Sequence, residues 1–357
     1  MRLVTIRPPG GEGAEPHSRR VAVVLASGRF LPLSMLAELA PDNLSEEIER
    51  LDLATVLALD PGFGAIREAL ARVEAGADAG ALDAASLDPA TVWLAGPIPR
   101  PGKIIGVGYN YLDHIREQGL ERPARPVLFS MFANAVTADG QPIRRPAGTH
   151  ALDLEAELAV VIGRCASRVA VADAERCVAG YTVANDVTAR DWQGQAMALR
   201  PGERGDGQWL RAKGSDTFLP LGPMLVTADE LGDGRGLRIR SWRTAAAGPN
   251  AGSPFQMQDG NTSDLLFGVA ELVSIVSQEV TLDPGDVIVT GTPSGVGVFR
   301  EPQVFLEPGD LVTVEVEHIG SLTNPITDED GRAPEGSPAA RFMATAGSTS
   351  THGKLGV

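Results

Sequence analysis

Residues 152–163, LDLEAELAVVIG, begin by alternating acidic with apolar residues and end in an unbroken apolar run. Every second side chain of a β-strand lies on the same face, so Asp153, Glu155 and Glu157 are predicted to point the same way. Three carboxylates on one face repel one another, and burial makes their charges more costly. The stretch therefore predicts a strand whose acidic face needs a compensating positive charge.

The sequence on either side of this strand indicates a β-rich protein. From 104 to about 325, short apolar runs are separated by Gly and Pro turns, which is typical of strands. One clear helix is expected at 263–278, with Ser263 as its N-cap. The motif PGD occurs at 284–286 and again at 308–310, and we interpret both as turns between strands.

The chain is predicted to contain a small and a large domain. Residues 1–96 mix strand-like and helical runs, which favours a small N-terminal α/β domain, and the prolines that follow indicate a linker. Residues 97–326 form the larger β-rich domain. Residues 327–357 contain few large apolar side chains, so a disordered tail is expected there.

Composition narrows the possible partners. The 357 residues carry a net charge of −15, which argues against nucleic acid or an anionic membrane as a partner, because both favour a basic surface. No apolar stretch is long enough to span a bilayer, and no signal-peptide pattern begins the sequence. The two cysteines, Cys165 and Cys177, have no metal-binding spacing. We expect a cytoplasmic protein.

The acidic strand is a candidate metal site. Glu155 and Glu157 can reach one cation from the same strand face, and Asp186, where a later apolar strand stops, could supply a third oxygen. Carboxylates without cysteine or clustered histidine suit Mg²⁺ or Mn²⁺ better than Zn²⁺. Glu-x-Glu alone is more often a pair of acids that face water. The apolar run that follows favours the metal site, because acids entering a buried strand need a partner charge.

His114 is the candidate general base. It follows a strand and a glycine turn, and Glu117 lies three residues later, so the two can touch on one helical face. A carboxylate beside an imidazole raises its basicity and fixes its tautomer. A His-x-x-Glu pair is also common by chance. His318 is interpreted as a surface residue, and His150, just before the acidic strand, could support the site from behind.

Seven segments in order resemble the fumarylacetoacetate hydrolase superfamily, most strongly from about 100 to 326. They are IIGVGYNYLDH, DLEAELAVVIG, GYTVANDVTARDWQ, AKGSDTFLPLGP, NTSDLLF, LDPGDVIVTGTPSGVG and EPGDLVTVEVEHIGSLTNPI. The resemblance implies a β-rich α+β fold, with a mixed β-sandwich roll of this type beside the N-terminal domain. It also implies a homodimer that binds Mg²⁺ or Mn²⁺ and a small-molecule 2-oxo acid or 1,3-diketone.

The resemblance also assigns roles to single residues. The metal ligands are Glu155, Glu157 and Asp186; the catalytic residues are His114, Glu117 and Lys213; the substrate-binding residues are Gln193, Thr292 and Tyr109. His114 and Glu117 would lie on a short lid helix, and Lys213 would face the substrate's carbonyl or carboxylate oxygens. Asp153 would be either an outer contact of the metal site or structural.

Two segments depart from the family pattern. Met131 stands where many members have lysine, which would remove a positive charge near the pocket. Residues 194–213 are longer than expected and are predicted to form a loop near the entrance. Arginines 200, 204 and 211 in that loop could meet an anionic substrate, although solvated surface arginines are the simpler interpretation.

We expect hydrolysis of an acylpyruvate-like 1,3-diketo acid to pyruvate and a carboxylic acid, with a role in the breakdown of aromatic compounds. In this mechanism His114 deprotonates a water, and Lys213 helps to stabilise the enolate that leaves. The alternative uses the same enolate without water, as a decarboxylase or tautomerase of oxaloacetate or a related oxo-diacid. Carbon–carbon bond chemistry like that of macrophomate synthase, in the same superfamily, is a rarer version. A catalytically silent binding protein is the remaining alternative.

Overall fold

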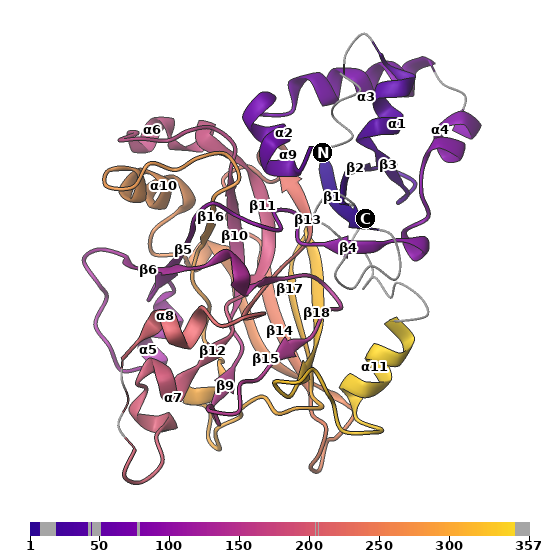
Figure 1. Ribbon diagram of the computed structural model, residues 1–357. Helices are drawn as coiled ribbons and strands as arrows, with labels where there is room; N and C mark the ends of the chain where they lie inside the picture. The colour runs from indigo at the N-terminus through magenta and orange to yellow at the C-terminus, as the bar shows by residue number, and fades with distance from the viewer. Residues whose placement is uncertain are drawn as a thin grey trace.

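The computed structural model describes residues 1–7, 19–41, 44, 51–76, 79–203, 205 and 207–346. Two β-sheets dominate this part of the chain (Figure 1). The larger sheet has the order β3 (Phe30–Pro32), β2 (Arg20–Val24), β1 (Arg2–Arg7), β13 (Leu219–Thr227), β11 (Val178–Asn185), β10 (Ala156–Ile162), β16 (Val287–Val289), β5 (Ile104–Gly108), β6 (Val127–Met131), with β4 (Trp93–Ala95) beside β1 and β7 (Val136–Thr137) beside β13. The smaller sheet has the order β15 (Pro254–Asn261), β14 (Arg238–Thr244), β17 (Leu311–Val316), β18 (Gly320–Thr327), β8 (Ile143–Arg144). The short strands β9 (Leu152–Asp153) and β12 (Thr188–Ala189) pair separately. This arrangement confirms the predicted β-rich α+β class.

The described residues also form helices. They are α1 (Leu33–Leu39), α2 (Leu53–Leu59), α3 (Gly64–Gly76), α4 (Ala79–Ala85), α5 (Leu112–Glu117), α6 (Val171–Ala174), α7 (Arg190–Gln193), α8 (Trp209–Lys213), α9 (Ala228–Leu231), α10 (Val269–Ser277) and α11 (Pro338–Ala346). Helices α1 to α4 gather at one end of the molecule (Figure 1). Among the helices described, none is long and apolar enough to cross a membrane.

Strand β10 is buried on both faces, which explains its unbroken apolar sequence. Leu158 and Val160 belong to a hydrophobic cluster shared with strands of the smaller sheet. Ala159 and Val161, which point the other way, belong to a cluster shared with α1, α2 and α3. The predicted strand is thus confirmed as the central layer between two cores.

The helix expected at 263–278 begins later than predicted. Thr262–Asp264 form a single 3₁₀ turn, and α10 starts at Val269, so Ser263 is not its N-cap. The residues between this turn and α10 contact the segment at Asn110 instead of continuing the helix. The Leu266 N–H donates to the Asn110 carbonyl at 2.9 Å. Glu271 accepts from the Gly268 N–H at 2.8 Å and closes the first turn of α10 instead.

Both PGD segments are turns, as predicted, and each is closed by its own buried aspartate. Asp286 accepts the backbone N–H groups of Lys103 and Asp283, both at 2.7 Å. Asp310 accepts those of Ala246 at 2.8 Å and Glu307 at 3.0 Å. The carboxylates therefore satisfy donors that the turns would otherwise bury unpaired.

The N-terminal segment shares the larger sheet with the rest of the protein. Strand β1 pairs antiparallel with β13, where Arg2 lies opposite Val226 and Leu3 opposite Leu225. Thr5 Oγ1 also donates to the Pro97 carbonyl at 2.9 Å. The first strands therefore extend the sheet that contains β10, and the boundary proposed at residue 96 stays a prediction.

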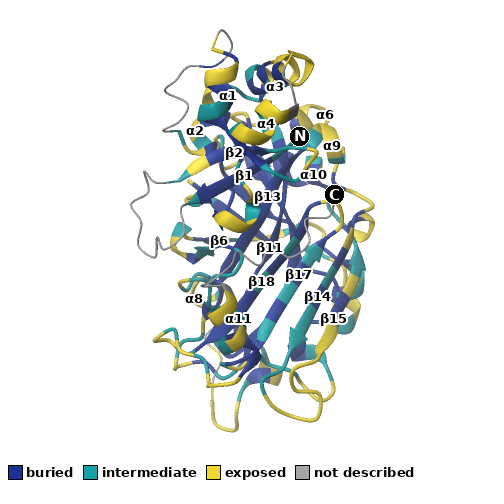
Figure 2. Ribbon diagram, turned by 90° about the vertical axis from the view of Figure 1, so that its right-hand side faces the viewer, coloured by how far each residue is buried: buried dark blue, intermediate teal, exposed yellow. Residues whose placement is uncertain are grey.

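The expected disordered tail differs from the structure over 327–346. Strand β18 runs to Thr327, and α11 packs against it (Figure 2). Ala339 is completely buried, and its N–H donates to the Gly309 carbonyl at 3.0 Å. Small residues let the helix approach that turn closely, so a composition poor in large apolar residues did not prevent docking. Residues 347–357 lie outside the described part of the chain.

Replacing Ala339 by glutamate should lower the thermal midpoint by on the order of 5 °C, because the charge would enter a buried contact between α11 and the Gly309 turn. Ala344→Glu is the matched control, since that residue is exposed on the same helix. Differential scanning calorimetry of both variants measures the effect. Equal midpoints would mean that α11 does not dock in solution.

Candidate active site

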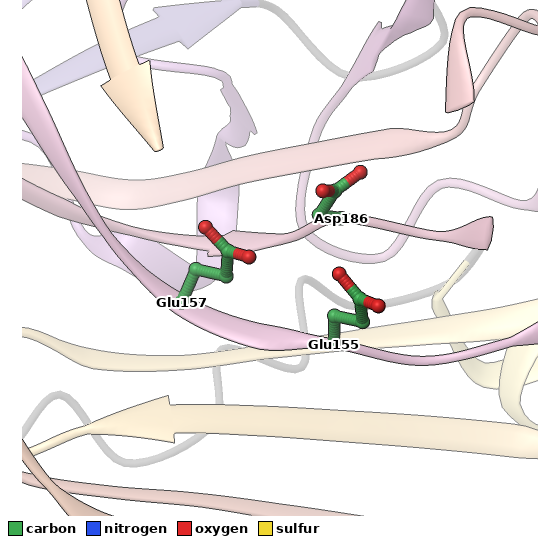
Figure 3. Close-up of side chains that lie close together, drawn as sticks. All are labelled: Glu155, Glu157 and Asp186. Carbon is green, nitrogen blue, oxygen red and sulfur yellow. The ribbon is translucent and has the colours of Figure 1, made fainter. Parts of the chain in front are cut away.

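Three acidic side chains meet at the end of the two central strands (Figure 3). Glu155 precedes β10, Glu157 lies within it, and Asp186 follows β11. One oxygen from each lies within 4.8 Å of the others, and all three residues are buried. The Asp186 N–H donates to the Glu155 carbonyl at 2.9 Å, and Asn185 Oδ1 accepts the Glu155 N–H at 3.0 Å. The antiparallel pairing thus gathers the three predicted ligands.

Asp153 binds a loop rather than joining the three acids. The strand is interrupted after Asp153, and its carboxylate accepts the N–H groups of Gly297 at 2.7 Å and Val298 at 3.1 Å. A Cβ at position 297 would lie 1.8 Å from the Val304 carbonyl oxygen and 2.7 Å from Asp153 Oδ1. Only glycine allows this approach. Of the two roles expected for Asp153, the contacts are those of a structural anchor.

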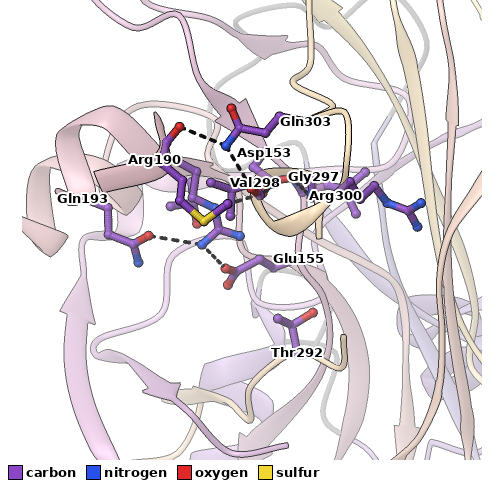
Figure 4. A network of polar contacts seen from close by, with 12 residues as sticks. Asp153, Glu155, Arg190, Gln193, Thr292, Gly297, Val298, Arg300 and Gln303 are labelled. Carbon is purple, nitrogen blue, oxygen red and sulfur yellow. Dashed lines mark hydrogen bonds and ion pairs between the residues drawn. The ribbon is translucent and has the colours of Figure 1, made fainter. Parts of the chain in front are cut away.

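Two buried cations neutralise part of the acidic cluster (Figure 4 shows Arg190). Arg190 contacts Asp153 at 2.9 Å and Glu155 at 2.7 Å. Lys213 Nζ lies 2.9 Å from Glu155 Oε2, 2.6 Å from Asp186 Oδ2 and 2.8 Å from Thr188 Oγ1. All three ammonium hydrogens of Lys213 therefore have acceptors. Its predicted contact with a substrate oxygen would require one of these acceptors to be exchanged.

The charges in the cluster do not balance. Four buried carboxylates, Asp153, Glu155, Glu157 and Asp186, face only two buried cations, Arg190 and Lys213. Fully ionised, this group would carry two uncompensated negative charges. A divalent cation would supply the missing charge.

The pKa values reflect this imbalance. Burial raises the pKa of Glu157 well above its usual range, and the carboxylates of Asp186 and Glu155 raise it further. Burial also raises the pKa of Asp186 to about 7, against the opposing effect of Lys213. Burial opposes ionisation of Glu155 as well, but Lys213 and Arg190 outweigh it and lower its pKa to about 2. Without a cation, burial and the neighbouring carboxylates therefore favour the protonated forms of Glu157 and Asp186.

The donor set fits Mg²⁺ or Mn²⁺. Carboxylate oxygens are the ligands these hard ions prefer. Asp186 Oδ1 is buried and has no hydrogen-bond partner, which is costly unless a ligand uses that oxygen. We therefore assign Glu155, Glu157 and Asp186 as the residues that would hold the cation.

Metal binding should strengthen as pH rises. Asp186 has a pKa of about 7 in the folded protein against its ordinary value of 3.8, so between these values the folded metal-free state holds more protons than the unfolded state. The stabilisation from this proton is lost as pH rises through that window, while the ionised carboxylate becomes available to Mg²⁺. The rise in thermal midpoint caused by Mg²⁺ should be larger at about pH 8 than at about pH 6. An equal rise at both would contradict a proton–metal competition.

Helix α5 places His114 over this cluster. His114 Nδ1 lies 2.5 Å from Glu117 Oε1, and Glu117 Oε2 accepts the Gly295 N–H at 3.0 Å. The carboxylate thus holds the imidazole by one nitrogen and leaves Nε2 for a bound molecule. His150 instead contacts Asp191 at 3.2 Å and does not line this cavity, and His318 is exposed.

One cavity contains eight of the nine predicted site residues. The ninth, Glu117, stands behind His114. The cavity and its mouth together enclose about 350 Å³, which includes space open to solvent.

The predicted substrate-binding residues differ in what they can still bind. Gln193 Oε1 accepts from Arg190 at 3.1 Å, so its amide N–H groups remain for the cavity. The Thr292 hydroxyl donates to the Ala156 carbonyl at 2.9 Å and accepts from Gln258 at 2.7 Å, so it chiefly braces the strand that carries Glu157. Tyr109 lines the cavity, and its ring lies edge-on to Trp209, with centroids 6.0 Å apart.

Among the lining residues that were missed from the sequence, two stand out, Arg190 and Trp209. Arg190 lies within the segment RDWQ that identified Gln193, and its buried Nη2 has no hydrogen-bond partner. Trp209 lies within the long segment 194–213 and packs on Phe129, with ring centroids 5.3 Å apart. A signal was present for each, because Arg190 lies four residues after the predicted ligand Asp186 and Trp209 lies four residues before Lys213.

Met131 and the segment 194–213, which depart from the family pattern, lie in different places relative to the cavity. Met131 is buried in the hydrophobic cluster beneath β6 and does not line the cavity, so it removes no charge from the cavity wall. The segment 194–213 does border the entrance, through Gln195 and Trp209. Arg211 lies over the ring of Trp192, 4.2 Å from its centroid, and Arg200 is exposed. Residue 204 lies outside the described residues.

Comparison with known proteins places the chain in a family. Residues 103–327 match the model of the fumarylacetoacetate (FAA) hydrolase C-terminal family. The mitochondrial oxaloacetate tautomerase fahd2 of Xenopus laevis is 42% identical over 240 residues, which cover 67% of this chain and 70% of the relative. The mitochondrial oxaloacetate tautomerase of Rattus norvegicus is 36% identical over 326 residues, or 91% of each chain.

Solved structures agree with this placement. A fumarylacetoacetate hydrolase from the psychrophilic Exiguobacterium antarcticum superposes with a TM-score of 0.68 at 29% identity, covering 92% of this chain and 99% of the other. A 5-carboxymethyl-2-hydroxymuconate delta-isomerase from Mycobacterium smegmatis gives 0.63 at 32% identity, with the same coverage. These likenesses confirm the predicted fold type, and the chain belongs to the fumarylacetoacetate hydrolase family.

Proposed function

We propose that this protein catalyses keto–enol tautomerisation of oxaloacetate or a closely related oxo-diacid. The observation that carries the proposal is the His114–Glu117 pair held over a buried carboxylate cluster that lacks two positive charges. The relatives described as oxaloacetate tautomerases support this reaction over the acylpyruvate hydrolysis favoured by the sequence alone.

The reaction moves one proton. The C3–H bond breaks, its electron pair forms the C2–C3 double bond, and the C2 carbonyl oxygen gains the proton. No water is consumed, so the cavity needs to admit only the small substrate. A group that accepts a proton at carbon and returns it to oxygen is therefore the minimum requirement.

His114, Glu117 and Lys213 have different roles in this reaction. His114 accepts the C3 proton at Nε2 and delivers it to the oxygen, while Glu117 holds the ring and stabilises the imidazolium. A bound Mg²⁺ or Mn²⁺ supplies the positive charge that stabilises a developing enolate. Lys213 contributes a fixed charge rather than a base, because the Asp186 and Glu155 carboxylates outweigh its burial and raise its pKa.

The two carboxylates of an oxo-diacid need donors as well. Arg190 Nη2 is buried, unpartnered and part of the cavity wall, and Gln193 has free amide hydrogens beside it. A guanidinium and an amide suit a carboxylate. We assign this pair to one carboxylate of the substrate.

Acylpyruvate hydrolysis remains the second candidate. The fumarylacetoacetate hydrolase among the structural neighbours favours it, and the His114–Glu117 pair could equally deprotonate a water. Homodimerisation, cytoplasmic location and a role in the breakdown of aromatic compounds stay predictions.

Proton NMR in D₂O separates these reactions in one experiment. Tautomerisation exchanges the C3 hydrogens of oxaloacetate for deuterium, so their signal should vanish faster with protein and Mg²⁺ than with Mg²⁺ alone. Decarboxylation would appear as pyruvate, and hydrolysis of an acylpyruvate as pyruvate plus a second acid. No acceleration of C3 exchange would overturn the proposal.

A further inference from the structure

Helix α5 cannot owe its shape to its own sequence. It has six residues, and isolated helices of that length are unstable in water. Its N-cap residue, Tyr111, makes no side-chain capping hydrogen bond. Contacts with the rest of the protein must therefore hold the helix, and with it His114, in place.

A carboxylate–hydroxyl contact supplies one such hold. Asp113 Oδ2 accepts the Ser294 hydroxyl at 2.7 Å and the Ser294 N–H at 3.1 Å. The other oxygen, Oδ1, accepts the N–H of His114 at 2.7 Å. Asp113 thus binds the helix to the loop and fixes the backbone of the neighbouring catalytic residue.

The same loop also contacts the acidic cluster. Gly291 N–H donates to Glu157 Oε2 at 2.7 Å, and Gly295 N–H donates to Glu117 Oε2 at 3.0 Å. Gly291 has φ +99°, and a Cβ there would lie 2.9 Å from that of Asn110. The segment 291–295 therefore binds a metal-site residue at one end and both acidic residues of α5 at the other.

We propose that Asp113 and Ser294 are positioning residues that hold α5 over the acidic cluster and so keep His114 in place against the substrate. We call the contact between these two residues the latch. The catalytic consequence rests on the proposed function, but the latch itself can be tested without any turnover. Neither residue lines the cavity, so neither touches the substrate.

Trypsin offers a direct probe of α5. Between Lys103 and Arg144 the possible cleavage sites are Arg116, Arg122 and Arg125, and the last two precede proline, which blocks trypsin. Arg116 is exposed but helical, so its peptide bond can be cut only when α5 opens. The rate of cleavage at Arg116, followed by mass spectrometry, therefore measures opening of the latch.

Ser294→Ala in the full chain should raise cleavage at Arg116 by about 10-fold, because a hydrogen bond to a charged group is lost. Asp113→Ala, which loses three hydrogen bonds, should raise it further. Ser294→Thr keeps a hydroxyl and should restore protection and turnover together. Ser167→Ala, which removes an exposed hydroxyl in contact with Thr281, is the matched control.

The outcomes are distinct. Faster cleavage at Arg116 in both variants, with rescue by threonine and no change in Ser167→Ala, supports the latch, whatever reaction the site catalyses. Unchanged cleavage in both Ser294→Ala and Asp113→Ala overturns it. If cleavage changes while no substrate reacts, the latch stands and the proposed function fails.

Discussion

Glu157→Gln should abolish tight binding of Mg²⁺ and Mn²⁺ while leaving the metal-free protein about as stable as the wild type. Burial and the neighbouring carboxylates raise the pKa of Glu157 well above its usual range, so the metal-free protein favours a neutral group at this position. Glutamine is neutral and of similar shape, and its carbonyl can still accept the Gly291 N–H. Losing a direct ligand should weaken the metal by about 100-fold or more, since losing outer-shell partners alone costs about 10- to 100-fold.

Asp153→Asn is the matched control for this variant. It likewise changes a buried carboxylate to an amide, at a residue outside the proposed ligand set, but it leaves Arg190 buried with less negative charge. Breaking a buried ion pair costs about 3–5 kcal/mol, so this variant should lose stability even without metal. Calorimetric titration with Mg²⁺ and thermal unfolding of both variants give the comparison. Wild-type Mg²⁺ affinity in Glu157→Gln would remove Glu157 from the ligand set.

His114→Ala should slow C3 proton exchange of oxaloacetate by about 10²–10⁴-fold, the usual contribution of a positioned general base. Glu117→Gln should cause a smaller loss, because the imidazole remains but its charged partner is gone. The Gly295 contact can persist through the glutamine carbonyl, so α5 should stay closed in that variant. NMR exchange rates at saturating Mg²⁺ measure both effects.

The same variants separate the rival reactions. Loss of carbon dioxide from oxaloacetate removes no proton by a base, so any decarboxylation should largely survive His114→Ala. Acylpyruvate hydrolysis needs an activated water and should fall with tautomerisation. Full C3 exchange in His114→Ala would place the base elsewhere and refute the mechanism.

The acidic cluster could be predicted because its signals were local. Glu155 and Glu157 alternate within one strand, and Asp186 follows the end of another, so antiparallel pairing was enough to bring them together. His114 and Glu117 are likewise three residues apart on one helix. Periodicity captures contacts of this kind.

Contacts between distant segments could not be predicted in this way. Lys213 lines the cavity, but its contacts with carboxylates from two other segments were not predicted. Asp153 alternates in the sequence with Glu155 and Glu157, as if it lay on the same strand face. Its carboxylate nevertheless accepts a hydrogen bond from the Gly297 N–H, 144 residues later in the chain. Helix α11 was missed because its docking depends on the shape of the turn at Gly309 rather than on apolar bulk.

The pairing of β1 with β13 joins two segments that are synthesised at different times. The strand Arg2–Arg7 is synthesised before its partner Leu219–Thr227, which leaves the ribosome only after some two hundred more residues. At about 5–20 residues per second this takes on the order of ten seconds or more. Throughout that interval the end of β1 at Arg2 and Leu3, which β4 does not cover, has open hydrogen-bonding groups and could pair with another nascent chain. This end of β1 is thus a place where aggregation can precede folding and where a chaperone would be useful.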